Sequence, residues 1–242
     1  MRRRLLAVIA LALLLLALAA APLVPRAAIA VYQRLRGRAT VEQRLAQYGP
    51  AARGRLRPHF ERAGVAYPPA RAVFLGLKSE KQLHIFAAGP AGDLRHIAAY
   101  PILAASGGPG PKLRRGDRQV PEGVYRVEAL NPNSFYHLSL RLNYPNEFDR
   151  AMAAADGRTD LGGDIMIHGS SGSVGCLAMG DPASEDLFTL AAETGPANIT
   201  VILAPGDPRI NPTLPAPADR PAWLDDLHRT IRAAIAALPR PR

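Results

Sequence analysis

The sequence predicts a mostly β domain with helices added to it, of the α+β class. Two stretches alternate apolar and polar residues with the period of a strand, "AVFLGLKSEKQLHIFAAG" and "DLRHIAAYPIL". Helical patterns lie near the beginning of the chain, directly after its single cysteine, and at its end. Because the chain has 242 residues, we expect one domain with a sizeable core and terminal extensions.

The first 30 residues predict an export or membrane segment. Three arginines, Arg2 to Arg4, precede an uncharged, mostly apolar run from Leu5 to Val24. As a helix, this run would reach about 30 Å, the hydrocarbon thickness of a bilayer. The positive-inside bias keeps the arginines in the cytoplasm, so we expect the rest of the chain in the periplasm or cell envelope. The alanines near Ala21 also suit a signal peptidase, so a membrane anchor and a cleaved signal both remain open.

Residues 31–69 predict a helical juxtamembrane segment. Its stretch "TVEQRLAQYGPAARGRLRPHFERAG" opens with the capping-box residues Thr40 and Gln43 and spaces apolar residues among charges. Because Gly49 and Pro50 interrupt the pattern, we expect short helices that break at this point.

Residues 70–206 predict the main domain, which begins with strands. We expect a three-stranded meander with a turn at Ser79 to Lys81, then a long Gly/Pro loop from Ala105 to a strand that starts at Gly123. The stretch "SFYHLSLRL" predicts a further strand, and "NYPNEFDRAMAAADGRTDLGG" predicts irregular structure.

The second half of this domain surrounds the single cysteine. The stretch "DIMIHG" predicts a short strand that ends at His168. After the cysteine we expect a helix with Ser184 as N-cap and Gly195 at its end, and then a buried strand over "NITVILAP". Residues 207–242 predict a Pro-rich linker and an amphipathic helix whose apolar stripe contains Trp223, Leu224, Leu227, Ile231 and Ile235.

The chain is strongly basic, with a formal net charge of +10. Such a charge favours contact with an anionic membrane surface or an anionic polymer. The sequence has no helix-turn-helix, aromatic ribonucleoprotein motif or zinc-finger spacing, so we expect no nucleic-acid partner.

The segment "IMIHGSSGSVGCLAMGD" places Cys176 eight residues after His168. A lone cysteine in an exported domain is a candidate reactive thiol. The intervening glycines let the chain fold back, so the imidazole can accept the thiol proton. The N–H groups of Gly175 and Cys176 are candidates for an oxyanion hole that also lowers the thiol pKa. Asp164 lies about 13 Å away along a strand, so a backbone carbonyl or another segment must orient His168.

Other chemistry fits this segment less well. His168 and Cys176 are too few ligands for a zinc site, and we expect no metal or other cofactor. The Gly-Lys-Ser/Thr ending of a phosphate loop and the G-x-S-x-G elbow of serine hydrolases are both absent. A buried, unreactive cysteine beside a turn histidine is the structural alternative.

Several motifs in the same order resemble the L,D-transpeptidase catalytic (YkuD-type) domain of bacterial cell walls. "HGSSGSVGCLAM" is similar to its His-Gly…Ser-x-Gly-Cys signature, and "GDRQVPEGVYRV" to its Thr/Ser-Pro-x-Gly-x-Tyr/Phe strand, with Val120 in place of the hydroxyl residue. Together with "SGGPGPKL" and "YHLSLRLNYPNEFDRA", these stretches resemble the YafK-like subgroup of that family. The resemblance spans residues 73–205.

The resemblance implies a β-sandwich-like catalytic domain with small helices. Cys176 would be the nucleophile and His168 the general base and acid, with Gly175, Ser173 and Gly169 in the active-site loop. Cys176 would attack the carbonyl between meso-diaminopimelate and D-alanine in a peptidoglycan stem peptide and form a thioester.

Many members of the family have arginine two residues after the cysteine, where this chain has Ala178. The substrate-binding candidates are therefore Arg150 or Lys112 as a replacement cation, and Tyr136 in the groove. An amine acceptor would make a transpeptidase, and water would make a hydrolase that releases peptides or wall-linked protein. A wall-linked lipoprotein is a further candidate partner, as is the inner membrane if the leader is retained. A non-catalytic peptidoglycan-binding module is the alternative of another class.

Overall fold

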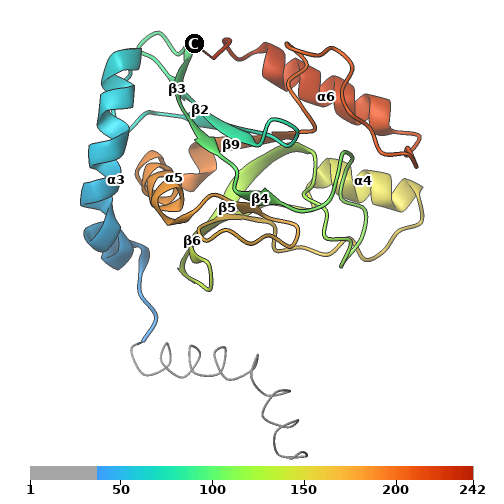
Figure 1. Ribbon diagram of the computed structural model, residues 1–242, viewed down its shortest axis with the longest axis horizontal. Coiled ribbons are helices and arrows are strands. Elements are labelled where there is room, and N and C mark those ends of the chain that lie inside the picture. The colour runs from blue at the N-terminus through green and yellow to red at the C-terminus, as the bar shows by residue number, and fades with distance from the viewer. Residues whose placement is uncertain (1–36, 242) are drawn as a thin grey trace, which may run out of the picture. The chain divides into compact units, whose positions relative to one another are not determined.

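The computed structural model describes residues 37–241 (Figure 1). From Thr40 onward, this described part is one unit of mixed α/β structure, with a nine-stranded sheet and four α-helices. The predicted leader, residues 1–30, lies outside the described residues, and within residues 37–241 no helix is long and apolar enough to span a membrane.

One half of the sheet contains the predicted meander. Strands β1 (Ala72–Leu77), β2 (Gln82–Ala88) and β3 (Leu94–Pro101) pair antiparallel in order, as predicted. Strand β9 (Ile199–Ala204), also predicted, runs parallel to β1 on its other side. All six residues of β1 are buried, because side chains cover both faces of the sheet at this point.

Strand β5 (Gly123–Ser134) joins the two halves, since it pairs with β9 through its first residues and with β6 (His137–Leu142) through its later ones. The register of β5 against β6 shifts twice, as at β-bulges, which bend a strand. The order continues through β7 (Met166–His168), β8 (Leu177–Ala178) and β4 (Ala104–Ala105). The strand predicted over "SFYHLSLRL" was too long, because Phe135 and Tyr136 form the turn between β5 and β6.

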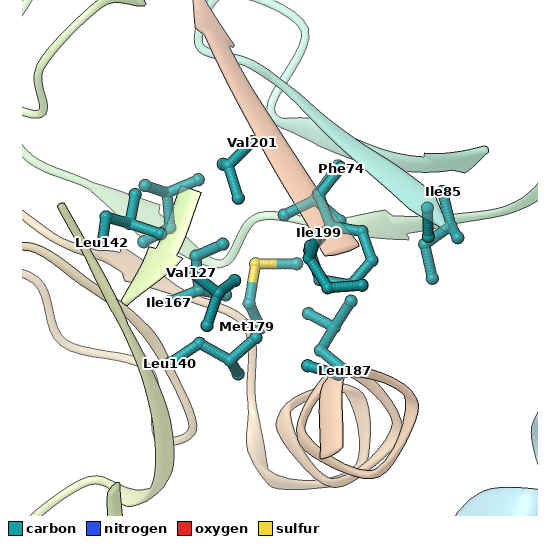
Figure 2. Close-up of a cluster of buried hydrophobic side chains, with 14 of the residues drawn as sticks. Phe74, Ile85, Val127, Leu140, Leu142, Ile167, Met179, Leu187, Ile199 and Val201 are labelled. Atoms are coloured by element: carbon teal, nitrogen blue, oxygen red, sulfur yellow. The ribbon is translucent and has the colours of Figure 1, made fainter. Parts of the chain in front are cut away.

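The main core lies between the inner faces of the sheet and helix α5 (Asp181–Thr194) (Figure 2). Phe74 and Ile199 from one half of the sheet meet Leu140 and Ile167 from the other, and Leu187 of α5 closes the cluster. This helix begins at Asp181 and not at the predicted cap Ser184. Gly180 precedes it, and the Ser184 hydroxyl donates to the Asp181 carbonyl within the first turn.

Helix α3 (Val41–Ala63) corrects the prediction of short helices. It has the predicted capping box at Thr40, and it continues through Pro50 and Pro58. An interior proline costs about 3 kcal/mol. Packing offsets this cost, since Leu56 and Phe60 are buried and Arg53 and Arg55 pair with acidic residues of α5. Figure 1 shows the two helices side by side.

Helix α4 (Glu147–Ala155) lies in a stretch expected to be irregular. Asn146 and Asp149 form a capping box in which each side chain accepts the other's backbone N–H. These residues replace the more usual Ser/Thr and Glu/Gln of that motif.

Helix α6 (Leu224–Ala236) confirms the predicted amphipathic helix at the end of the chain. Its stripe packs on the face of β1, β2 and β9 opposite the main core, where Leu224, Leu227, Ile231 and Ile235 are at most 2% exposed. Burial of each such side chain contributes about 1.5–3 kcal/mol. Helix α6 therefore covers the second face of the central strands.

Candidate active site

Two short parallel strands place His168 and the residue before β8, Cys176, at neighbouring positions of the sheet. In the register of β7 with β8, Ile167 lies opposite Leu177 and His168 opposite Ala178. Ile167 and Leu177 point into the main core. Because side chains alternate along a strand, His168 projects from the opposite face, and Cys176 lies in the bend directly before β8. The structure therefore brings together the two residues that the sequence singled out.

A backbone carbonyl orients the imidazole of His168, one of the two options left by the sequence. His168 is 1% exposed, and its Nδ1 lies 2.6 Å from the Gly169 carbonyl oxygen. A carbonyl only accepts, so Nδ1 bears the proton and Nε2 keeps a lone pair. Burial lowers the pKa of His168, against the smaller opposing effect of this carbonyl. The ring is therefore a neutral base at pH 7.

Tyr136, a predicted groove residue, covers the imidazole. Its ring stacks on His168 with centroids 4.6 Å apart and an interplanar angle of 29°, while 46% of the residue remains exposed. Gly169 fits against the same turn, because a Cβ there would lie 2.8 Å from the Tyr136 carbonyl oxygen. Gly169 is thus required for close packing beside the base.

The Cys176 thiol is half-buried and donates to the Asp164 carbonyl oxygen, 3.6 Å away, and not to His168. Burial raises the pKa of the thiol, while a backbone hydrogen bond at Met166 and the charge of Lys112 act in the opposite direction. The expected lowering of the thiol pKa is therefore wrong. The two shifts favour the uncharged forms, a thiol at Cys176 and a neutral imidazole at His168.

Two serine hydroxyls hold the loop before Cys176. The Gly175 N–H donates to Ser106 Oγ at 2.6 Å, and the Cys176 N–H donates to Ser173 Oγ at 3.2 Å. Ser173 Oγ also donates to the Cys176 carbonyl at 2.6 Å. Both N–H groups proposed for an oxyanion hole are thus occupied by hydroxyls. Ser106 was missed from the sequence because 69 residues separate it from Gly175.

The structure places the two candidate cations in different surroundings. Lys112 is 6% exposed, pairs with Asp117 Oδ1 at 2.5 Å, and lies near enough to influence the Cys176 pKa. Arg150 is exposed on α4, where its guanidinium donates to the Pro145 carbonyl. The structure therefore brings Lys112, and not Arg150, toward the thiol.

A hollow next to Cys176 is lined by further cations. Two adjoining cavities of about 230 and 180 Å³ share Arg115, Gly162, Gly163 and Asp164. We call them the basic groove; its other charged lining residues are Lys112, Arg118, Arg141 and Glu128. Arg118 was not among the predicted site residues, although it lies within the motif "GDRQVPEGVYRV". Within residues 37–241, no three His, Cys, Asp or Glu side chains are arranged to hold a metal ion.

The family model of the YkuD L,D-transpeptidase catalytic domain matches residues 79–203, more than half of the chain. The chain belongs to this family. The match contains β2 to β8, most of β9, and both His168 and Cys176.

Relatives within the family include YafK of Escherichia coli strain K12, whose name places it among the L,D-transpeptidases. The two chains are 38% identical over 94 residues, which is 38% of this chain and 36% of YafK, and YafK of strain O157:H7 gives the same values. The match thus spans about a third of the length of these curated relatives.

Two solved structures also show similarity. The helical cell shape determining protein Pgp2 from Campylobacter jejuni has a TM-score of 0.45 and 26% identity, with 57% of this chain and 48% of Pgp2 covered. Bd1075 from Bdellovibrio bacteriovorus has a TM-score of 0.40 and 22% identity, with 60% and 52% covered.

Proposed function

We propose that this protein is a cell-envelope cysteine acyltransferase that acts on peptidoglycan stem peptides. The main support is the tautomer of His168, because the Gly169 carbonyl holds the proton on Nδ1 and leaves Nε2 as a base on the strand that pairs with β8, directly after Cys176. Membership of the YkuD family supports peptidoglycan as the substrate.

With both groups uncharged, the thiol loses its proton during the attack. His168 Nε2 takes the proton as Cys176 Sγ bonds to the carbonyl carbon between meso-diaminopimelate and D-alanine. The tetrahedral intermediate then breaks its C–N bond, and His168 returns the proton to the leaving amine of D-alanine. An acceptor amine or water then attacks the thioester carbonyl, with His168 again taking its proton. The second tetrahedral intermediate breaks its C–S bond, and His168 returns the proton to Cys176 Sγ.

Before the attack, the thiol must turn from the Asp164 carbonyl toward His168. Catalytic hydrogen bonds are often long or misaligned until substrate binds, so this movement is compatible with the roles proposed. Ser106 holds the Gly175 N–H group near the thiol, and Ser173 holds that of Cys176. These groups would stabilise the oxyanion once substrate displaces the hydroxyls.

The test is to incubate the purified full-length protein with sacculi and to identify the products by mass spectrometry. New diaminopimelate–diaminopimelate bonds would identify a transpeptidase. Released peptides or protein fragments would identify a hydrolase. Absence of both kinds of product would refute the proposed acyl transfer.

Cys176→Ala is the matched control. We expect this variant to bind sacculi as wild type does and to form no product. Turnover by Cys176→Ala would refute the role of the thiol. Binding without turnover by the wild type would identify a peptidoglycan-binding module.

A further inference from the structure

The basic groove ends beside Cys176, on the side away from His168. Asp164 lines both of its cavities, and the Asp164 carbonyl accepts the thiol hydrogen bond. Cys176 directly precedes Leu177, the register partner of Ile167, so it lies between the Asp164 end and the His168 end of β7. A substrate that crosses Cys176 therefore has one half over the basic groove and the other over His168 and Tyr136.

The roles proposed for His168 determine which half of the donor peptide lies over the basic groove and which lies over His168. In the proposed reaction His168 gives a proton to the leaving amine and takes one from the acceptor, so both must lie at the His168 end. The acyl half must then extend over the basic groove. This half of a stem peptide contains free carboxylates, from the second centre of meso-diaminopimelate and from the preceding glutamate.

Among the cations of the groove, Arg118 is the one whose charge is unmatched within the described residues. Lys112 pairs with Asp117 at 2.5 Å, Arg115 with Asp160 at 3.0 Å, and Arg141 with Glu128 at 3.0 Å. Arg118 is exposed and forms no ion pair with a residue that the structure describes. An exposed guanidinium can form a bidentate pair with a carboxylate.

The backbone fixes Arg118 next to the cysteine loop. Arg118 has φ of +55°, a left-handed conformation that is strained in a non-glycine residue. Asp117 holds the loop, because its carboxylate accepts the backbone N–H groups of Leu113 and Gln119. On the other side, a Cβ at Gly175 would lie 3.5 Å from the Gln119 carbonyl and 3.9 Å from the Arg118 carbonyl carbon. Strained conformations that the surroundings enforce cluster at functional sites.

We infer that the acyl half of the donor peptide lies in the basic groove with a carboxylate on Arg118, and that the leaving group and acceptor lie beside Tyr136. This inference rests on the proposed function, since the position of the leaving amine follows from the role of His168. It assigns Arg118 as a specificity residue for an anionic acyl donor.

The test measures binding in the full-length Cys176→Ala protein, which cannot react. The ligands are the tetrapeptide L-Ala-γ-D-Glu-meso-diaminopimelate-D-Ala and its analogue with the two acyl-half carboxylates amidated. We expect Arg118→Gln to weaken binding of the free tetrapeptide roughly tenfold or more, as for loss of a charge-assisted hydrogen bond. Binding of the amidated analogue should be unchanged.

Arg114→Gln is the matched control, because Arg114 is exposed on the same loop, lies outside the groove lining, and loses the same charge. An Arg118→Gln variant that binds both ligands as the parent does, or weakens both equally, would overturn the inference. Equal effects of Arg114→Gln and Arg118→Gln on binding would also overturn the inference, since the loss of affinity would then come from the change in net charge alone. Failure of the wild type to process sacculi would instead count against the proposed function, because the binding measurement needs no turnover.

Discussion

The substitution Gly169→Ala, which adds one methyl group, tests the close packing beside His168. An ideal Cβ at this residue would lie 2.6 Å from Asp181 Oδ1, 2.8 Å from the Tyr136 carbonyl oxygen and 2.9 Å from His137 Cβ. The carbonyl belongs to the β5–β6 turn and the Cβ to the first residue of β6, so neither can rotate away as the end of a flexible side chain can. Gly169→Ala must therefore displace either this turn or the backbone of residue 169.

Gly169→Ala should lower both the thermal stability of the protein and the rate of Cys176 acylation. Overpacking of this kind costs about 1–3 kcal/mol. For a protein of this size each kcal/mol lowers Tm by about 2–4 °C, so we expect a decrease of roughly 2–12 °C. A displaced Gly169 carbonyl also misplaces His168, and a shift of about 1 Å in a catalytic group can cost roughly 100-fold in rate.

The assay combines thermal unfolding, followed by circular dichroism, with the rate of Cys176 acylation by a carbapenem, followed by mass spectrometry of the intact protein. Gly172→Ala is the control in the same loop, because a Cβ at Gly172 meets no atom within 4 Å. We expect Gly172→Ala to stay within about 0.5 kcal/mol of wild type. Equal losses in the two variants, or a Gly169→Ala protein with wild-type Tm and acylation rate, would refute the packing argument.

Three further outcomes are expected. Because burial raises the pKa of Cys176, its alkylation by iodoacetamide should still increase with pH above the ordinary cysteine pKa, and a rate plateau near neutral pH would instead reveal a thiolate–imidazolium pair. A carbapenem should label the wild type at Cys176 alone and label His168→Ala more slowly, so equal labelling, read by peptide mass spectrometry, would exclude His168 as the base. Lys78→Met leaves the fully buried Glu122 without its cation and should cost about 3–5 kcal/mol in urea unfolding, whereas Arg115→Met, which breaks an exposed pair, should cost less than about 1 kcal/mol.

Regular local patterns made most strands and helices predictable. The meander, β9, β7 and the apolar stripe of α6 follow from alternation or from helical spacing, which act over a few residues. The continuity of α3 through Pro50 could not be predicted in this way. It depends on contacts with α5, more than 100 residues later in the chain.

In the candidate site, too, local features were predictable and long-range contacts were not. His168 and Cys176 could be predicted because a strand, a glycine-rich loop and a cysteine follow each other in one short segment. The hydroxyl of Ser106 on the Gly175 N–H, and the Tyr136 ring on His168, join segments that are distant in sequence. The direction of the thiol pKa shift was also inaccessible, since it depends on how deeply the folded chain buries Cys176.

The shortness of β7, β8 and β4 means that local stability decreases from one side of the sheet to the other. These strands have three, two and two residues, whereas β1 and β9 have six each and pair along their whole length. Regions with few backbone hydrogen bonds open with little free energy, independently of global unfolding. Amide hydrogens around Cys176 should therefore exchange with solvent well before those of β1 and β9. In the proposed function, the edge beside Cys176 can adapt to a bulky polymeric substrate while the centre of the domain stays folded.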